Sequence, residues 1–365
     1  MKYKLVNKDI REDYVNELLR ERGVIDINTF LCPTEAALQS YQALNNIQDG
    51  VNLLVKHCNK NDKIGLVVDC DMDGFTSSAI VYGRLKQAWP DLEITYYIHK
   101  GKQHGLQDCW QFWQDYPQDL LIIPDAGTND KEYAEKLDMD IIILDHHLYE
   151  DGGIADNMLV INNQMSGDYK NKDLSGAGIA YQFCRALDKE LGVYCADDFI
   201  DLAAFGIIGD MMSGLETENQ FIWKKGLARI KNEFLKALIE KQSYSMGGKV
   251  NPISVAFYIV PLVNAMIRVG TQTEKERMFL AFIDGNREVP SQKRGAKGTM
   301  EKVAIESARE CTNARSKQNR ILDAVEQEIE IKIHKYDLLE NKILIIKLDE
   351  EDFPSELNGS TILAR

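Results

Sequence analysis

Short apolar runs recur at regular intervals along the first half of the chain. They are rich in Ile, Val and Leu and only four to six residues long, which favours buried strands over buried helices. The runs cover residues 64–68, 93–98, 120–123, 141–144 and 158–161. Between them, apolar residues recur with helical spacing, most clearly over 75–88 and 131–137. Strands that alternate with helices in this way predict a parallel α/β sheet.

The second half of the chain has mostly helical periodicity. Apolar helices are predicted over 176–191 and 197–208, and one long helix with few breakers over 299–337. A fresh apolar run at 342–348 predicts a strand that begins another α/β unit. The chain therefore divides into an N-terminal helical extension (1–62), an α/β domain (63–215), a helical subdomain (216–298), a connecting helix (299–337) and the beginning of an incomplete second α/β domain (338–365).

Composition indicates size and compartment. The chain has 365 residues, 44% of them hydrophobic, which is enough for two domains with separate cores. Its seven cysteines include no Cys-x-x-Cys pair, so we interpret them as reduced thiols and not as a disulfide framework or a zinc site. No apolar run reaches membrane-spanning length, and the start has no signal-peptide segment. We expect a cytoplasmic protein without a membrane partner.

Carboxylates and imidazoles follow several of the predicted core elements. They are Asp69, Asp71, Asp73, Asp125, Asp145, His146, His147 and Asp210. The carboxyl ends of parallel strands meet at one edge of a sheet, so we expect these side chains to converge. A buried carboxylate without a partner is costly, and a divalent cation is a suitable partner for a cluster. Oxygen ligands with one or two imidazoles favour Mg²⁺ or Mn²⁺ over Zn²⁺.

The spacing within two of these segments indicates separate roles. In an extended segment, Asp71 and Asp73 would point to the same side, with Gly74 allowing a sharp turn into a helix. Thr76 and Ser77 at the start of that helix are predicted phosphate contacts. In Asp145-His146-His147, one imidazole would bind metal and the other would contact the substrate. Two cations held together can activate a water for attack on a phosphodiester.

Charge leaves two interpretations open. The net charge of −14 argues weakly against a nucleic-acid partner, but residues 286–320 carry nine basic and four acidic residues. This segment is either a solvated helix face or a basic wall that holds a phosphodiester. The loop with His99, Lys100, Lys102 and His104 is either an ordinary polar loop or a phosphate-binding loop.

The motifs resemble those of the DHH phosphoesterase superfamily and, within it, the RecJ-like single-strand-specific exonucleases. The four superfamily motifs correspond to residues 68–77, 123–125, 144–147 and 209–210. Three further stretches resemble RecJ in particular, at 30–33, 175–178 and 261–268. The resemblance covers roughly residues 25–365 and identifies 63–215 as the DHH domain and 338–365 as the opening of a DHH-associated domain.

The resemblance implies a role for each residue that matches a motif. Two Mn²⁺ or Mg²⁺ ions would be bound by Asp71, Asp73, Asp125, His146 and Asp210. Asp69, Asp145 and His147 would support these ligands or contact the substrate during catalysis. The predicted substrate contacts are Thr76, Ser77, Lys100, Lys102, His104, Ser175, Gly176, Gly178, Asn264 and Arg268. The loop at 98–106 lacks the arginine usual in the family, which Lys100 or Lys102 would replace.

The resemblance implies a 5′→3′ exonuclease that hydrolyses single-stranded DNA, with replication or repair proteins as further partners. RNA is an alternative polymer. A phosphodiesterase acting on short oligonucleotides or cyclic dinucleotides would share the metal chemistry but would not need the basic segment. A replication scaffold without activity is the non-enzymatic alternative. The glycine-rich substrate motif of the DHH-associated domain is absent before Arg365, which predicts good metal binding and a weak grip on DNA.

Overall fold

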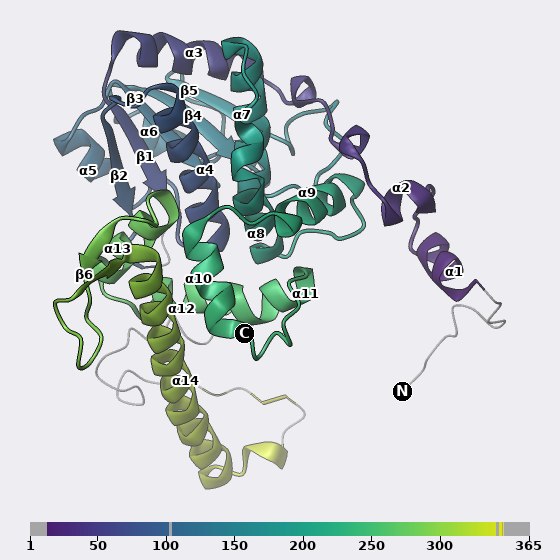
Figure 1. The fold of residues 1–365 in the computed structure, drawn as a ribbon, viewed down its shortest axis with the longest axis vertical. Helices are drawn as coiled ribbons and strands as arrows, with labels where there is room; N and C mark the ends of the chain where they lie inside the picture. Colours follow the sequence, from purple (N-terminus) through teal and green to yellow (C-terminus); the bar gives the residue numbers. More distant parts are fainter. Residues whose placement is uncertain (1–12, 102–103, 341–342, 345, 347–365) are drawn as a thin grey trace.

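The computed structural model describes residues 13–101, 104–340, 343, 344 and 346. The N-terminal segment contains α1 (Tyr14–Glu21), α2 (Ile27–Leu31), the short 3₁₀ helices η1 (Glu35–Ala37) and η2 (Tyr41–Ala43), and α3 (Ile47–Lys60). Figure 1 shows it running from α3 past α9 and outward to α1. This part of the chain is helical and loop-like, in agreement with its sequence pattern.

A five-stranded parallel sheet forms the centre of the first half. Its strands are β1 (Ile64–Val68), β2 (Ile94–Ile98), β3 (Leu120–Pro124), β4 (Asp140–Asp145) and β5 (Met158–Asn162). The order is β2-β1-β3-β4-β5, with every pair parallel. The predicted parallel α/β sheet is therefore confirmed. The order changes direction between β1 and β3, and ligands of open α/β sheets bind outside the strand ends at such a point.

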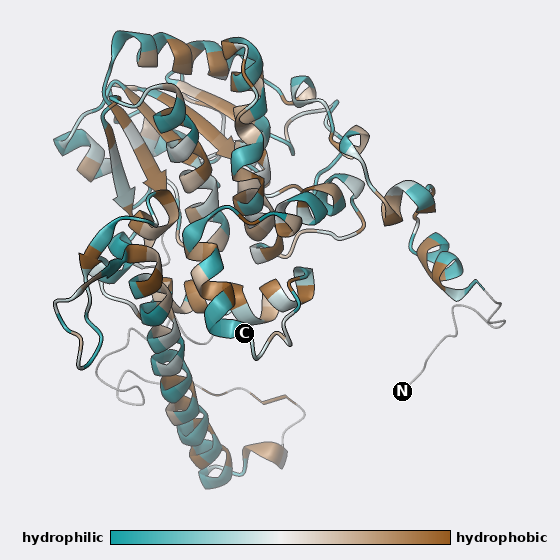
Figure 2. Cartoon of the chain, viewed as in Figure 1, coloured by the Kyte–Doolittle hydropathy of each residue, from teal (hydrophilic) through white to brown (hydrophobic). Residues whose placement is uncertain are grey.

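Alternate strand residues face two different helical layers, since successive side chains in a strand point to opposite faces. Leu66 and Val68 of β1 pack into one core with α4 (Met72–Ala88) and α7 (Gly176–Leu191). Val67 packs into the other core with α5 (Trp110–Asp115) and α6 (Lys131–Ala134). Figure 2 shows the hydrophobic strands between these helices. The strands are continuous apolar runs because both faces are buried.

Helices extend the fold below the strand ends. The almost wholly apolar α8 (Ile200–Gly209) follows the 3₁₀ helix η3 (Ala196–Phe199) and packs against α4 and α7. It is followed by α9 (Thr217–Ala228), α10 (Glu233–Gln242), α11 (Pro252–Ser254), the π-helical turn η4 (Val255–Ile259), α12 (Val260–Val269) and α13 (Gln272–Ile283). In Figure 1 the arrows of β1 and β2 point toward α12 and α13.

The long helix is shorter than predicted and is preceded by strands. It is α14 (Val303–Lys335), and it packs against α10, α12 and α13. The boundary predicted at residue 299 instead falls in an antiparallel hairpin of β6 (Glu288–Pro290) and β7 (Met300–Lys302). The sequence pattern did not predict this hairpin, because its strands are only three residues long and the segment 287–302 is rich in charged residues. The short helix η5 (Leu338–Glu340) follows α14, and most of the strand predicted at 342–348 lies outside the described residues.

One continuous helical stretch, Pro252–Val269, is long and apolar enough to cross a membrane by length and composition alone. The expectation that no such run exists is therefore corrected. Half of the stretch is buried, and α12 packs against α14. Val255, Ile259, Val263 and Met266 are buried, as in a core helix of a folded domain, whereas Ile253 and Phe257 are exposed.

Candidate metal centre

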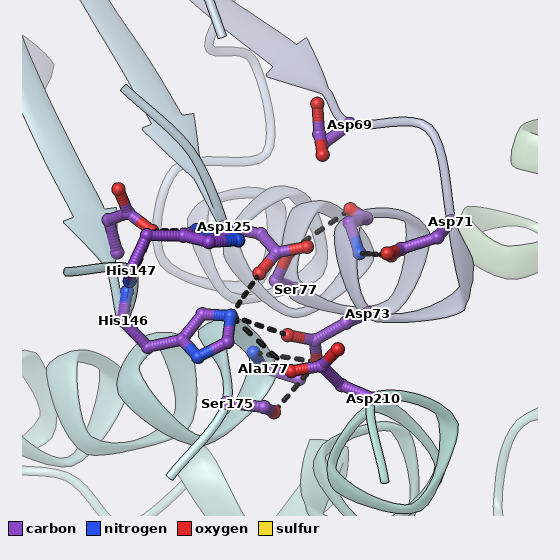
Figure 3. A network of polar contacts seen from close by, with 12 residues as sticks. Asp69, Asp71, Asp73, Ser77, Asp125, His146, His147, Ser175, Ala177 and Asp210 are labelled. Carbon is purple, nitrogen blue, oxygen red and sulfur yellow. Dashed lines mark hydrogen bonds and ion pairs between the residues drawn. The ribbon is translucent and has the colours of Figure 1, made fainter. Parts of the chain in front are cut away.

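Four segments converge beyond the carboxyl ends of β1, β3 and β4 and the end of α8. His146 is at the centre of the group (Figure 3). Its Nε2 atom lies 3.1 Å from Asp125 Oδ1, 3.5 Å from Asp210 Oδ2 and 4.0 Å from Asp73 Oδ2. The structure thus brings together four of the five predicted metal ligands around one imidazole nitrogen. The fifth, Asp71, lies at the edge of the group.

Asp71 and Asp73 reach the site from a helix start and not from an extended segment. Helix α4 begins at Met72, and Asp71 is its N-cap, with Oδ1 accepting from the Gly74 amide at 3.0 Å. The predicted alternation along a strand is therefore wrong, since Asp73 lies in the first helical turn. Gly74 is needed for close packing and not for a sharp turn. A Cβ there would lie 2.6 Å from the Asp69 Cβ atom.

Buried polar groups fix the position of the Asp73 carboxylate. Its Oδ1 accepts hydrogen bonds from Ser175 Oγ at 2.8 Å and from the Ala177 amide at 3.1 Å. A Cβ at Gly206 would lie 2.4 Å from the same Oδ1 atom. Sequence reasoning missed Gly206, although it lies one helical turn before Asp210 and so faces the same way. With Oδ1 held, Oδ2 is left to face His146.

The glycine-rich start of α7 also supports carboxylates. A Cβ at Gly176 would lie 2.4 Å from Asp125 Oδ1, and one at Gly178 would lie 2.3 Å from a Leu174 methyl. Ser175, Gly176 and Gly178 are all buried. The structure speaks against their predicted role as substrate contacts, because close packing with Asp73, Asp125 and Leu174 accounts for all three.

Asp125 adopts a backbone conformation that non-glycine residues rarely adopt. Its φ is +67°, in the left-handed region, while its amide still donates to the Leu144 carbonyl at 2.8 Å. Such strain costs about 1–3 kcal/mol and persists only where the surroundings enforce it. Here the left-handed turn at the end of β3 directs the carboxylate toward His146 (Figure 3).

Asp145 organises the loop that carries both histidines. Its Oδ1 accepts from the amides of His146 and His147 and faces His147 Nδ1 at 2.8 Å, while its Oδ2 accepts from the Thr128 amide at 3.0 Å. Burial alone would raise the pKa of Asp145, but these hydrogen bonds and the His147 charge hold it below the usual value. The bond to Asp145 raises the pKa of His147 to about 9. His147 is therefore a cation near neutral pH.

The remaining carboxylates are not satisfied by the protein. Among the described residues, Asp73 Oδ2, Asp125 Oδ1 and Asp210 Oδ2 are buried and accept no hydrogen bond. Burial, followed by the charges of Asp73 and Asp71, raises the pKa of Asp125 well above its usual value and that of Asp210 to about 8. Burial and the Asp73 charge raise the pKa of Asp71 to about 6. Burial lowers the pKa of His146.

A divalent cation fits this arrangement. Buried carboxylate oxygens without a donor need positive charge, and a neutral imidazole can offer a lone pair. One triad of ligand atoms, Asp73–His146–Asp210, is close enough to hold an ion, and Asp125 Oδ1 lies 3.1 Å from the same His146 nitrogen. The donors are oxygens and imidazole nitrogens without a thiolate, which suits Mn²⁺ or Mg²⁺.

Several predicted substrate contacts lie elsewhere. Thr76 and Ser77 are fully buried, and their hydroxyls donate to the Met72 and Gly74 carbonyls one helical turn earlier. They are not available to a phosphate, because the helix start packs against α7 and α8. Lys100 is exposed, Lys102 lies outside the described residues, and His104 faces Asp69, with 2.7 Å between Nδ1 and Oδ2.

Asn264 and Arg268 lie on α12, which packs near the start of α4, the helix that carries Asp71 and Asp73. Asn264 Oδ1 accepts from the Met72 amide at 3.2 Å, so it satisfies a free donor at the start of α4. Arg268 is half-buried one turn later, and among the described residues its guanidinium has no ion-pair partner. Asn264 is thus a capping residue, whereas Arg268 remains a predicted phosphate contact.

The basic segment at 286–320 is divided between paired and free charges. Arg309 forms ion pairs with Glu301 and Glu306, so it is neutralised within the protein. Arg309 therefore does not contribute free positive charge to the predicted basic wall. Lys293, Arg294 and Lys297 are exposed in the loop between β6 and β7, with no ion pair among the described residues. This loop carries the free positive charge of the segment.

Comparisons with known proteins agree with the site. Residues 63–207 match the DHH family, N-terminal domain. The chain is 38% identical over 357 residues to the SPbeta prophage protein YorK of Bacillus subtilis, whose name gives it provisionally as a single-strand DNA-specific exonuclease; the match covers 96% of this chain and 61% of YorK. It is 28% identical over 268 residues to the single-stranded-DNA-specific exonuclease RecJ of the same organism, covering 70% of this chain and 33% of RecJ.

The fold matches a solved structure as well. RecJ of Thermus thermophilus in complex with Mn²⁺ superposes with a TM-score of 0.68 at 24% identity, covering 89% of this chain and 44% of that one. The chain thus spans about three fifths of the length of YorK and less of the RecJ proteins. Residues 63–207 therefore form a DHH-family N-terminal domain, and the likeness to YorK extends over 96% of the chain.

Proposed function

We propose that this chain is a divalent-metal-dependent phosphodiesterase that degrades single-stranded DNA from the 5′ end. The group of unsatisfied carboxylates around His146 is the observation that carries the proposal, since it needs cations and lies at the switch point of the sheet. The names of YorK and RecJ support the substrate. The direction of digestion rests on the family resemblance alone.

The ligands of the two proposed ions would be Asp71, Asp73, Asp125, His146 and Asp210. When bound, Mn²⁺ or Mg²⁺ would lower the pKa of a water and stabilise charge on the phosphate oxygens. Ser175 and the Ala177 amide hold Asp73 in place, and the left-handed turn at Asp125 directs its carboxylate inward. These contacts keep the carboxylates preorganised, so little rearrangement is needed during reaction.

His147 supplies the proton chemistry in this proposal. The contact with Asp145 fixes Nδ1 as a donor and directs Nε2 away from that carboxylate. Because its pKa is raised to about 9, His147 can donate from Nε2 to a phosphate oxygen or to the leaving oxygen at neutral pH. About half of its side chain is exposed, so a substrate can reach it.

The substrate class can be tested with labelled strands. Purified protein with Mn²⁺ should shorten a 5′-labelled single strand to labelled mononucleotides at once, while a 3′-labelled strand should give a descending ladder. Blunt duplex should resist. Release of label from the 3′ end first would reverse the proposed polarity. Preference for a dinucleotide over the long strand would instead favour a phosphodiesterase that acts on short oligonucleotides.

Arg268→Ala should weaken binding of a single strand more than it affects metal binding. Arg268 is cationic and half-buried, and it lies one helical turn after Asn264, which caps the start of α4. Loss of one phosphate contact lowers the slope of log affinity against log salt by ~0.7. Fluorescence anisotropy at several salt concentrations measures this slope. If the slope stays the same, Arg268 has a structural role only.

Reversing the charge of Lys293, Arg294 and Lys297 together should raise the Michaelis constant for long single strands and leave that for a dinucleotide unchanged. Their side chains are exposed in the β6–β7 loop, outside the group of carboxylates around His146, so we expect only a long strand to contact them. Steady-state kinetics on both substrates tests this. Lys224, Lys225 and Lys231 are suitable controls because each is already bonded within the protein. Equal effects on both substrates would mean that the loop does not contact the single strand.

We also propose a cytoplasmic location and a role in DNA repair or recombination alongside replication or repair proteins. All seven cysteines are free thiols, which fits a reducing compartment. Fractionation of cells that express a tagged protein tests the location, and recovery in a membrane fraction would contradict it.

A further inference from the structure

A second group of metal-binding side chains lies beside the carboxylate centre, between the loops that follow β1 and β2. Asp69 and Cys70 follow β1, and His99 and His104 follow β2. His104 Nδ1 lies 2.7 Å from Asp69 Oδ2, and both of its ring nitrogens lie 3.8 Å from the Cys70 sulfur. One ligand atom from each of Asp69, Cys70 and His104 lies within 4.8 Å of the others.

Two buried groups in this cluster lack partners. His99 is 1% exposed, and neither of its ring nitrogens has a hydrogen-bond partner among the described residues. Its Nε2 atom lies 3.9 Å from Asp69 Oδ1, which is buried and also accepts no hydrogen bond. Buried polar side chains almost always have a partner, because leaving one unsatisfied costs free energy. An imidazole and a carboxylate that face each other without a bond indicate a missing ligand between them.

The donor types differ from those around His146. A thiol, two imidazoles and one carboxylate form a typical ligand set for Zn²⁺, whereas the oxygen-rich group suits Mn²⁺ or Mg²⁺. Figure 3 shows Asp69 apart from the side chains that surround His146. The two groups are therefore neighbouring sites with different preferences, and Asp69 belongs to the thiol-containing one. The spacing of cysteines along the sequence gives no information on ligands that come from two separate loops.

We propose that Asp69, Cys70 and His104 form a Zn²⁺ site, with His99 as the fourth ligand. The bound ion would join the β2 loop to the residue pair that precedes helix α4. The same loop is already held from the other side, since Lys275 of α13 donates to the Lys100 carbonyl at 2.6 Å. Zn²⁺ would thus fix the loop that carries Lys100 next to the carboxylate centre. This site does not depend on the proposed hydrolysis.

The thiolate gives the site a spectroscopic signature that the carboxylate centre lacks. Metal-free protein in excess Mg²⁺ is titrated with Co²⁺, and near-ultraviolet absorption reports charge transfer from thiolate to metal. We expect a band that saturates at one equivalent in the wild type and is displaced by Zn²⁺. Cys70→Ser should abolish it, and His104→Ala or His99→Ala should weaken Co²⁺ binding by about tenfold or more.

Two variants serve as controls. Cys32→Ser removes an exposed cysteine that is distant in sequence from the cluster and should leave the band unchanged. Asp125→Asn alters the carboxylate centre and should also retain the band. Absence of a band in the folded wild type, or survival of the band in Cys70→Ser, would overturn the proposal and leave His104 and Asp69 as a simple ion pair. Circular dichroism establishes that each variant is folded.

Discussion

Asp125→Asn should reduce hydrolysis of single-stranded DNA by at least about 100-fold, the effect typical of losing one preorganised charge-stabilising group. Asp125 Oδ1 lies 3.1 Å from His146 Nε2, is buried and accepts no hydrogen bond. An amide at this position keeps the shape but removes the negative charge that holds a cation. His146→Ala should have an effect of similar size, because its imidazole nitrogen faces the carboxylates of Asp73, Asp125 and Asp210.

The fold should survive this change. The metal-free site contains several carboxylates that repel one another, so loss of one charge should raise or maintain the melting temperature in the presence of a chelator. Asp138→Asn is a matched control, because Asp138 is exposed at the opposite end of the sheet, just before β4. Near-wild-type hydrolysis by Asp125→Asn would mean that this carboxylate is not a metal ligand.

Stability of the metal-free protein should fall as pH rises from about 5 to about 8. The pKa values of Asp71, Asp125 and Asp210 are raised in the folded state, to about 6 for Asp71 and about 8 for Asp210. A carboxyl whose folded pKa is raised binds its proton more tightly when folded. The stability that this proton provides is therefore lost as pH rises from the unfolded value, about 3.9, through the folded value.

His147 and His104 act in the same direction over this range. Their hydrogen bonds with Asp145 and Asp69 raise the pKa values of His147 and His104, so their contribution to stability is lost as pH rises above about 6.5. Asp145, whose pKa is lowered, contributes only to the acid limb below pH 4. Burial lowers the pKa of His146, so this residue acts in the opposite direction below about pH 6.5. Above that pH, Asp125, Asp210, His147 and His104 all predict a loss of stability.

Mn²⁺ should cancel most of this loss. A cation binds the deprotonated carboxylates, so the gain in melting temperature on adding Mn²⁺ should be larger at pH 8 than at pH 5.5. Each kcal/mol corresponds to about 2–4 °C in a domain of this size. Differential scanning fluorimetry in chelator and in Mn²⁺ measures both curves, and Asp210→Asn should flatten the chelator curve. A gain that does not change with pH would contradict the raised pKa values.

The sequence was sufficient to place the sheet and most of the metal centre. Strands buried on both faces appear as continuous apolar runs, so β1, β3 and β4 could be located, and the polar residues that follow them had to share one edge. Asp73, Asp125 and His146 could therefore be placed together from the sequence alone. It could not distinguish a helical first turn from an extended segment, since both conformations bring Asp71 and Asp73 near the site.

The errors concern residues whose role depends on neighbours that are distant in sequence. Thr76 and Ser77 resemble a phosphate-binding helix start, but α7 and α8 cover them. Ser175 resembles a substrate contact, but its hydroxyl donates to Asp73, 102 residues away in the chain. Arg309 resembles a free cation until β7 and the first turn of α14 bring Glu301 and Glu306 to it. Such pairings are fixed only by tertiary packing.

In the proposed mechanism, hydrolysis requires cations in the carboxylate centre. The most direct test measures Mn²⁺ occupancy and hydrolysis of a 5′-labelled single strand in the same metal-free sample, with Mn²⁺ added in steps. We predict two ions bound per chain, hydrolysis that rises in proportion to occupancy, and loss of both in His146→Ala. Hydrolysis that persists in excess chelator, or full Mn²⁺ occupancy in His146→Ala, would contradict the assignment.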